Sequence, residues 1–218
     1  MALAVQSVFS RYNSNFYYIP YPKNNIIWAN EMNQSVTSIE RRVTVEEYTN
    51  LYNTHLRNQH QPHIDKNYTF AFFDRFISIE NSELSLSSED FEILHQLRCY
   101  RNDKKLIVTD IENSAKDEKH PRIKGLSDFL TKISFPYDSG ELSKEDVQYL
   151  TGGWFEEYVY HLIRERLNPT DIVLGPKTAK TNNDLDVVFT IGNKLFVIEC
   201  KTGVEGKGML NEIVYKAS

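Results

Sequence analysis

The chain has 218 residues and a formal net charge of -5, and 40% of its residues are hydrophobic. This composition suits a globular protein of one or two domains, and the acidic balance excludes a chain-wide basic surface for nucleic acid. Two cysteines, Cys99 and Cys200, lack metal-ligand spacing and favour a reducing compartment, so a cytoplasmic location is expected. No apolar run approaches the roughly 20 residues of a membrane span, so no membrane association is expected.

The N-terminal residues predict one helix and two strands. Residues 1–12 have the apolar spacing of an amphipathic helix and lack the basic start of a signal peptide. The runs "NFYYIPYP" and "NNIIWAN" predict short strands on either side of the turn "PKNN". These elements are too few for a domain. Residues 1–34 are therefore predicted to be the last part of a domain or one flank of a larger sheet.

The middle of the chain, residues 35–141, is mixed and polar. One helix is predicted over 44–56, where Thr44 and Glu47 have capping-box spacing, and a second over 87–101, capped by Ser88. The run "LIVTDI" (106–111) predicts a strand, 112–122 a charged loop, and "GLSDFLTKISF" a third helix. Several small helices with one strand indicate a linker or a winged-helix-like module.

From residue 142 the pattern is clearer. "LSKEDVQYL" begins with a Ser143 cap, "TGG" breaks or reorients the chain, and 154–167 form an amphipathic helix that Asn168-Pro169 ends. "DIVLGP" predicts a strand. On a helical wheel, Glu156 falls at the edge of the apolar face of the 154–167 helix and Glu157 falls toward solvent. Glu156 is thus a candidate acid, although first-turn glutamates are also favoured by the helix dipole alone.

The segment "DLDVVFTIGNKLFVIECK" (184–201) predicts a β-hairpin with a two-residue Gly192-Asn193 turn. In that register Asp186 faces Glu199 and Asp184 faces Lys201, so all four charges share one face of the hairpin. The apolar residues pair with one another in the same register, which supports it.

Two carboxylates that face each other across a hairpin favour a cation between them. Cβ atoms of opposed residues lie about 4.5–5.5 Å apart, where like charges destabilise. Hard oxygen ligands at that separation suit Mg²⁺ or Mn²⁺. Lys201 beside them could orient a water or stabilise charge on a phosphate. The simpler reading is a solvated edge pair, but the apolar run 196–198 before Glu199, and Asp186 opposite it, favour a metal site.

Other candidates are weaker. Lys177 and Lys180 could bracket a nucleic-acid phosphate path, but ordinary surface lysines explain them better. His60 and His63 of "HQPH" lack a cysteine or carboxylate at metal-ligand spacing and predict a polar loop. No Gly-rich phosphate loop and no nucleophile-elbow pattern occurs in the sequence.

The run "TGGWFEEYVYHLI … NDLDVVF … KLFVIECKTG" resembles the PD-(D/E)xK nuclease superfamily. The likeness is greatest to the branch fused to CARF sensor domains, the CRISPR-associated nucleases activated by cyclic oligoadenylate. This resemblance implies an α/β fold: a C-terminal restriction-endonuclease-like core over 142–218, a helical middle module over 35–141, and a remnant of a Rossmann-like CARF domain over 1–34. It also implies a chain truncated at both ends.

The resemblance further implies roles for the site residues. Asp186, Glu199 and the Cys200 carbonyl would hold Mn²⁺ or Mg²⁺, with Asp184 as a possible further ligand. Lys201 and Glu156 would complete the catalytic set, while the Cys200 thiol would pack in the core. The expected reaction is hydrolysis of DNA or RNA in antiviral defence, by a homodimer regulated by cyclic oligoadenylate in the full-length form.

Two alternatives stay open. The chain could be a degenerate nuclease fold that acts as a nucleic-acid-binding or regulatory module without catalysis. It could also be a repair or restriction nuclease that has no nucleotide sensor.

Overall fold

The computed structural model describes residues 16–18, 25–29, 34–38, 42–52, 54–77, 85–114, 117, 119–179 and 184–202, the first three ranges by backbone alone. The helix predicted over 1–12 lies outside the described residues, as does Lys180. Strands β1 (Phe16–Tyr18) and β2 (Asn25–Ala29) pair antiparallel, which confirms the two N-terminal strands. A third strand, β3 (Gln34–Ser38), pairs with β2, where the polar sequence predicted none.

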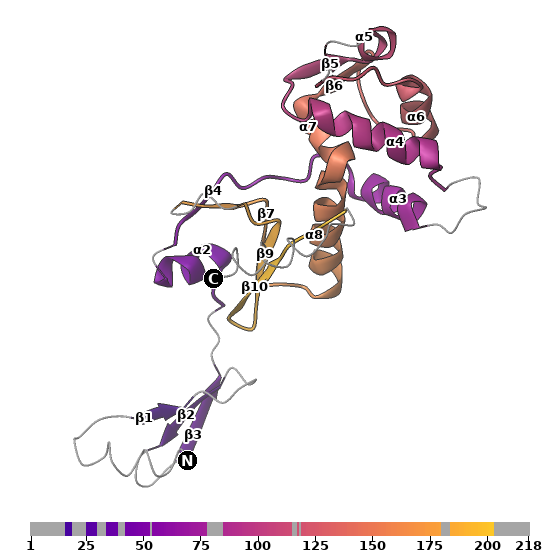
Figure 1. Cartoon of the computed structure of the whole chain (residues 1–218). Coiled ribbons are helices and arrows are strands. Elements are labelled where there is room, and N and C mark those ends of the chain that lie inside the picture. Colours follow the sequence, from indigo (N-terminus) through magenta and orange to yellow (C-terminus); the bar gives the residue numbers. More distant parts are fainter. Residues whose placement is uncertain are drawn as a thin grey trace.

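The helical part of the molecule is built from short helices, of which α4 and α7 begin with capping boxes (Figure 1). Its elements are α3 (Lys66–Ile77), α4 (Ser88–Leu97), the 3₁₀ helix η2 (Arg98–Tyr100), α5 (Val108–Asn113), α6 (Leu126–Lys132) and α7 (Lys144–Gln148), with the strand pair β5 (Lys105–Ile107) and β6 (Glu141–Ser143). Their core contains the fully buried Phe72, Leu97, Tyr100, Leu130 and Tyr149.

Two predicted boundaries in this part are wrong. Ser87, not Ser88, caps α4, because its hydroxyl accepts from the Asp90 N–H while Asp90 accepts from the Ser87 N–H. The predicted strand 106–111 ends at Ile107, because β6 offers only three residues to pair with. The chain then turns into α5, where Val108 and Ile111, three residues apart, both face the core.

Another helix is shorter than predicted. Thr44 and Glu47 form the expected capping box of α2 (Val45–Leu51), but the predicted residues up to 56 are not all helical. Leu56 instead begins β4 (Leu56–Arg57), which pairs with β8 (Lys177–Thr178). Val45 at the start of α2 is fully buried against Val173 and Val188, so α2 packs on the strand layer.

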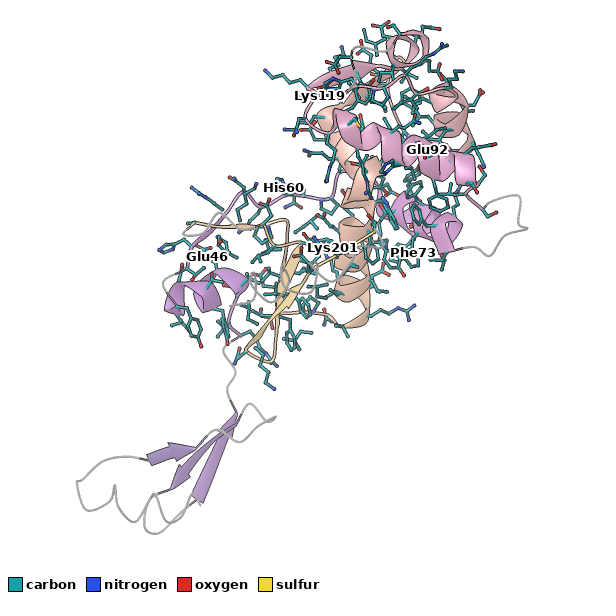
Figure 2. The ribbon with its side chains drawn as sticks, in the orientation of Figure 1. Glu46, His60, Phe73, Glu92, Lys119 and Lys201 are labelled. Atoms are coloured by element: carbon teal, nitrogen blue, oxygen red, sulfur yellow. The ribbon has the colours of Figure 1, made fainter. Side chains whose placement is uncertain are left out.

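Helix α8 (Trp154–Arg166) runs between the helical part and a three-stranded antiparallel sheet (Figure 1). The strand order in this sheet is β10 (Lys194–Ile198), β9 (Val187–Ile191), β7 (Asp171–Leu174). On one side Phe73 of α3 stacks on Tyr158, with ring centroids 3.7 Å apart. On the other side Tyr160 and Ile163 pack in one cluster with Val187 and Phe189 of the sheet. Figure 2 labels Lys201 over α8 and Phe73 beside it.

Packing on two sides explains one wrong prediction from the helical wheel. Glu157 was expected to face solvent but is buried, only 6% exposed. Its carboxylate accepts hydrogen bonds from the backbone N–H groups of His63 (2.7 Å) and Ile64 (3.3 Å). A wheel assumes one buried face, whereas the first turn of α8 is covered by α3 and by the 58–65 segment.

The predicted hairpin is present, and its register is as predicted over the ladder, 187–198, but the predicted pair Asp184–Lys201 is wrong because Asp184 pairs with Lys177. Strands β9 (Val187–Ile191) and β10 (Lys194–Ile198) pair antiparallel, with Val188 opposite Val197. Gly192 and Asn193 both have positive φ, 55° and 61°, as a type I′ turn requires. Strand β7 (Asp171–Leu174) covers the other edge of β9. Within the described residues, no helix is long and apolar enough to cross a membrane.

Candidate metal and phosphodiester site

The hairpin opens at the end that carries the acidic residues. Val187 and Ile198 form the last pair of the ladder, so Asp186 and Glu199 are the next residues on each strand. One carboxylate oxygen of Asp186 accepts the Cys200 backbone N–H at 2.5 Å, which ties the two strands together beyond the ladder. The Asp186 carbonyl accepts the Gly175 N–H at 2.8 Å, which ties it to the end of β7.

Lys201 is paired with Glu199. The lysine Nζ lies 2.7 Å from Glu199 Oε1, and the glutamate side chain is only 7% exposed, against 30% for the lysine. A carboxylate this buried is stable only with a cation or several donors beside it. Lys201 provides that cation in this structure.

Glu156 enters the same region from the first turn of α8. Burial, followed by the negative charge of Asp186, raises the pKa of Glu156 to about 7, while the positive charge of Arg101 opposes the rise. Asp186 and Glu199 both act on this pKa, so the three carboxylates lie within electrostatic reach of one another. The structure therefore gathers Glu156, Asp186, Glu199 and Lys201, as the sequence predicted.

Two glycines before α8 allow Glu156 to reach this place. Helix α7 passes through a π-helical turn, η3 (Tyr149–Gly153), in which Gly152 has φ +156° and kinks the chain before α8 begins. A Cβ on Gly153 would lie 3.2 Å from the Gln148 carbonyl oxygen. The "TGG" sequence thus reorients the chain, as predicted, and aims the first turn of α8 at the hairpin.

Glu156, Asp186 and Lys201 line a cavity of about 610 Å³. Its walls come from three parts of the chain: the 60–63 segment, Arg101 and α7–α8 of the helical part, and the ends of β7, β9 and β10. Among its lining residues are His60, His63, Arg101, Glu145, Glu156, Lys177, Asp184, Asp186 and Lys201.

Asp184 and Lys177 pair with each other at the cavity. Lys177 Nζ lies 2.8 Å from Asp184 Oδ1, and the two residues form an isolated β-bridge. The Asp184 side chain is 61% exposed. In this arrangement the Asp184 carboxylate neutralises Lys177.

Cys200 is buried at the base of the hairpin. Burial, reinforced by the charge of Asp186, raises the pKa of its thiol to about 12. The thiol therefore stays protonated at neutral pH and is a poor nucleophile. Its backbone N–H holds Asp186.

The donor set suits a hard divalent cation, since it offers carboxylate oxygens and a backbone carbonyl. As they stand in the described part of the chain, however, no three histidine, cysteine or acidic side chains are arranged to hold a metal ion. Glu199 is occupied by Lys201, and Asp186 by the Cys200 N–H. A metal held here would have to take Glu199 over from Lys201.

The sequence did not identify all residues that build the cavity. The "HQPH" segment is a loop, as predicted, but it forms part of the wall: the His60 N–H bonds the Leu174 carbonyl, and His63 Nε2 lies 2.8 Å from Asp146 Oδ1. Arg101 was also missed. Both lie far from the hairpin in sequence, and no local pattern links them to it.

Two solved structures have a fold similar to that of this chain. By structure, the chain is similar to VC1899 from Vibrio cholerae (TM-score 0.65, 20% identity, 97% of this chain and 58% of that one). It is also similar to Can2 from Sulfobacillus thermosulfidooxidans, solved in complex with cyclic tetra-adenylate (TM-score 0.55, 22% identity, 99% of this chain and 58% of that one). The chain thus has the mixed α/β fold of these proteins and spans 58% of the length of each.

No curated protein matches the sequence significantly. One protein-family model does match, over residues 143–217, and its description is "Card1-like, endonuclease domain". The matched residues include Glu156, Asp186, Glu199 and Lys201. The part of the chain that carries the acidic hairpin is therefore similar to a Card1-like endonuclease domain.

Proposed function

We propose that this chain carries a metal-dependent endonuclease site that hydrolyses phosphodiester bonds of DNA or RNA. The observation that carries the proposal is that Glu156, Asp186 and Lys201 line one cavity and Lys201 pairs with Glu199, within the segment that matches an endonuclease domain. The same residues resemble the motif of the PD-(D/E)xK superfamily.

Asp186, Glu199 and the Cys200 carbonyl would hold Mn²⁺ or Mg²⁺, with Asp184 as a possible further ligand. The bound metal would supply a Lewis acid and lower the pKa of water. Lys201, released from Glu199, would donate to the phosphate as negative charge grows on its oxygens. Glu156, which lines the same cavity, would accept a hydrogen bond from the attacking water.

Regulation is proposed for a longer form of the protein. The chain spans 58% of the Can2 chain, which was solved with cyclic tetra-adenylate. By analogy, residues 1–34 would be the end of a CARF sensor, residues 35–141 a winged-helix-like middle module, and the activator a cyclic oligoadenylate. A homodimer acting in CRISPR-linked antiviral defence, in the cytoplasm, completes this proposal.

The test is a cleavage assay on labelled single- and double-stranded DNA and RNA, in Mn²⁺ or in EDTA. It is run with and without cyclic oligoadenylates, using the full open reading frame. Cleavage that requires Mn²⁺ and disappears in Lys201→Ala is expected. Equal cleavage in EDTA, or Mn²⁺-dependent cleavage retained by Lys201→Ala, would contradict the proposal.

One observation favours a second function, a binding module without catalysis. Glu199 and Asp186 are both satisfied by groups of the protein itself, so the fold does not require a metal. Calorimetric titration with Mn²⁺ separates the two functions. The nuclease should release or absorb heat that Asp186→Asn abolishes, whereas a binding module should show no heat that depends on Asp186.

A further inference from the structure

The cationic side chains of the cavity are unequally partnered. Lys177 is neutralised by Asp184 at 2.8 Å and Lys201 by Glu199 at 2.7 Å. His63 lies 2.8 Å from Asp146. The guanidinium of Arg101, by contrast, has no hydrogen-bond or ion-pair partner among the residues that the structure describes. An anionic substrate that enters this acidic cavity would find in Arg101 a permanent positive charge free to bind it.

Arg101 is held in place by its backbone. It directly follows η2, and its N–H bonds the Arg98 carbonyl. The preceding residue, Tyr100, is fully buried, and its hydroxyl donates to the Pro121 carbonyl at 2.7 Å. The arginine side chain therefore projects from a fixed base and lines the same cavity as Glu156 and Asp186.

A second arginine stands beside the first. In a 3₁₀ helix, side chains three residues apart eclipse one another and are separated by about 6 Å along the axis. Arg98 and Arg101 have this spacing. Arg98 Nη2 lies 3.5 Å from the Thr202 hydroxyl, directly after Lys201, and lines a second, smaller hollow of about 190 Å³ with Trp154 and Phe76. Arg98 thus lies beside the chain where it leaves the hairpin, and Arg101 lines the cavity that contains Lys201.

We propose that Arg101 binds a backbone phosphate of the nucleic acid strand in the cavity, and that Arg98 binds a phosphate farther along the same strand. The inference rests on the proposed function and names the residues that hold its substrate. Guanidinium groups suit this task because they stay charged and donate two parallel hydrogen bonds to phosphate oxygens.

The test measures binding apart from cleavage. Fluorescein-labelled 20-nucleotide DNA and RNA of one mixed sequence, single- and double-stranded, are titrated in EDTA at several KCl concentrations. Arg101→Ala should weaken binding about 10-fold and reduce the slope of log affinity against log salt by roughly 0.7–0.9. Arg98→Ala should act in the same direction by a smaller factor. The matched control Arg166→Ala, at the exposed far end of α8, should bind as the wild type does.

A double-mutant cycle tests whether Arg101 affects binding only through Glu156. If Arg101 served only to offset the Glu156 charge, Arg101→Ala would have no effect on binding in a Glu156→Gln background. The proposal expects the same loss in both backgrounds, and Arg101→Lys should recover the salt slope but not the full affinity. Loss of the effect in Glu156→Gln would overturn it.

The inference and the proposed function fail differently. The inference would be overturned if Arg101→Ala had the same affinity and the same salt slope as the wild type. It would also be overturned if the wild type did not bind the oligonucleotides. The same oligonucleotides in Mn²⁺ report cleavage by the wild type, whose absence would count against the nuclease. Binding that depends on Arg101 without cleavage would leave the inference standing and select the binding module.

Discussion

The helical part and the hairpin end use the same residue type, the carboxylate, in opposite ways. In the helical part, Asp90, Asp146 and Glu112 each accept at least two hydrogen bonds from defined donors. At the hairpin end, Glu156 has no hydrogen-bond donor among the described residues, and its pKa is raised by burial and by Asp186. One region uses its acids to stabilise the fold, whereas the other crowds them together at a cost. Such crowding is typical of functional sites.

Glu199→Gln gives the largest expected effect. If the hairpin acids serve chemistry, this change should lower Mn²⁺-dependent cleavage more than about 100-fold, because it removes a charged metal ligand. Removing a residue that only hydrogen-bonds to a metal ligand already lowers activity or metal affinity about 10- to 100-fold. The melting temperature should change little. The matched control is Glu141→Gln, which breaks the exposed Lys105–Glu141 pair on β6 and should cleave as the wild type does. Equal cleavage by Glu199→Gln and Glu141→Gln would contradict the assignment.

Asp90→Ala should lower stability and leave cleavage unchanged, the reverse of Glu199→Gln. Burial alone would raise the pKa of Asp90, but bonds from Lys132 and Ser87 lower it below its usual value. Removing the carboxylate loses a capping box and leaves Lys132 unpaired, so unfolding free energy should fall by about 3 kcal/mol. Cleavage per folded molecule should persist. Urea titration measures the loss, and the exposed neighbour Glu89→Ala should cost under about 0.5 kcal/mol.

The same variant has a defined pH dependence. A carboxyl whose pKa is lowered by folding contributes stability above its unfolded value, and that contribution is lost as pH falls through the folded pKa. The difference between wild type and Asp90→Ala should therefore be largest near neutral pH and shrink below about pH 4. A difference that grows in acid would contradict the ion pair.

Glu156→Gln should stabilise the protein. A carboxyl whose pKa is raised by folding weakens stability as pH rises from its unfolded value, about 4.5, to its folded value, about 7. At pH 8 the variant should exceed the wild type by about 2 to 3 kcal/mol, and near pH 4.5 by almost nothing. Thermal melts across this pH range measure the difference in stability. The control is Glu145→Gln, a change at an exposed residue of the cavity, which should be as stable as the wild type. Added Mn²⁺ should reduce this difference in stability, because only the wild type keeps the full set of acids to bind the metal.

The smallest predicted effect concerns the cavity wall. Gly175 has φ +59°, and a Cβ there would lie 2.5 Å from His60 Cδ2. Gly140 has a similar φ of +76° with nothing within 4 Å of such a Cβ. Gly175→Ala should therefore cost about 1 to 2 kcal/mol more than Gly140→Ala, through overpacking rather than backbone strain. Adding His60→Ala should remove most of the difference. Equal melting temperatures for the two glycine variants would show that the histidine moves away freely.

Local patterns were sufficient for elements whose causes are local. The hairpin register follows from a two-residue turn and alternating apolar residues, and the start of α2 follows from Thr44 and Glu47. The sequence also identified the acids of the site, because they sit in that hairpin or on the helix after "TGG". The wheel placed Glu156 correctly and Glu157 wrongly, since it could not show that the 58–65 segment covers the first turn of α8.

Local sequence patterns did not predict which segments pair when they lie apart in the chain. Strand β3 is a polar run that becomes a strand only because β2 lies beside it, and β5 ends where β6 does. Arg101 belongs to a turn that looks like any charged surface turn. Its position at the cavity depends on how the buried Tyr100 packs in a core shared with Tyr149. Sequence patterns carry no information on such distances.

The kink at Gly152 has a geometric consequence for the width of the cavity. Arg101 is fixed to the helical core on one side of the joint, whereas Asp186 and the sheet pack along α8 on the other. Glu156 lies only four residues beyond Gly152, about 6 Å along the helix, so a bend of 10° there would displace it by about 1 Å. The far end of α8, about 20 Å away, would swing by 3 to 4 Å. The bend angle at this single glycine therefore affects how far Arg101 stands from Asp186 and Glu156.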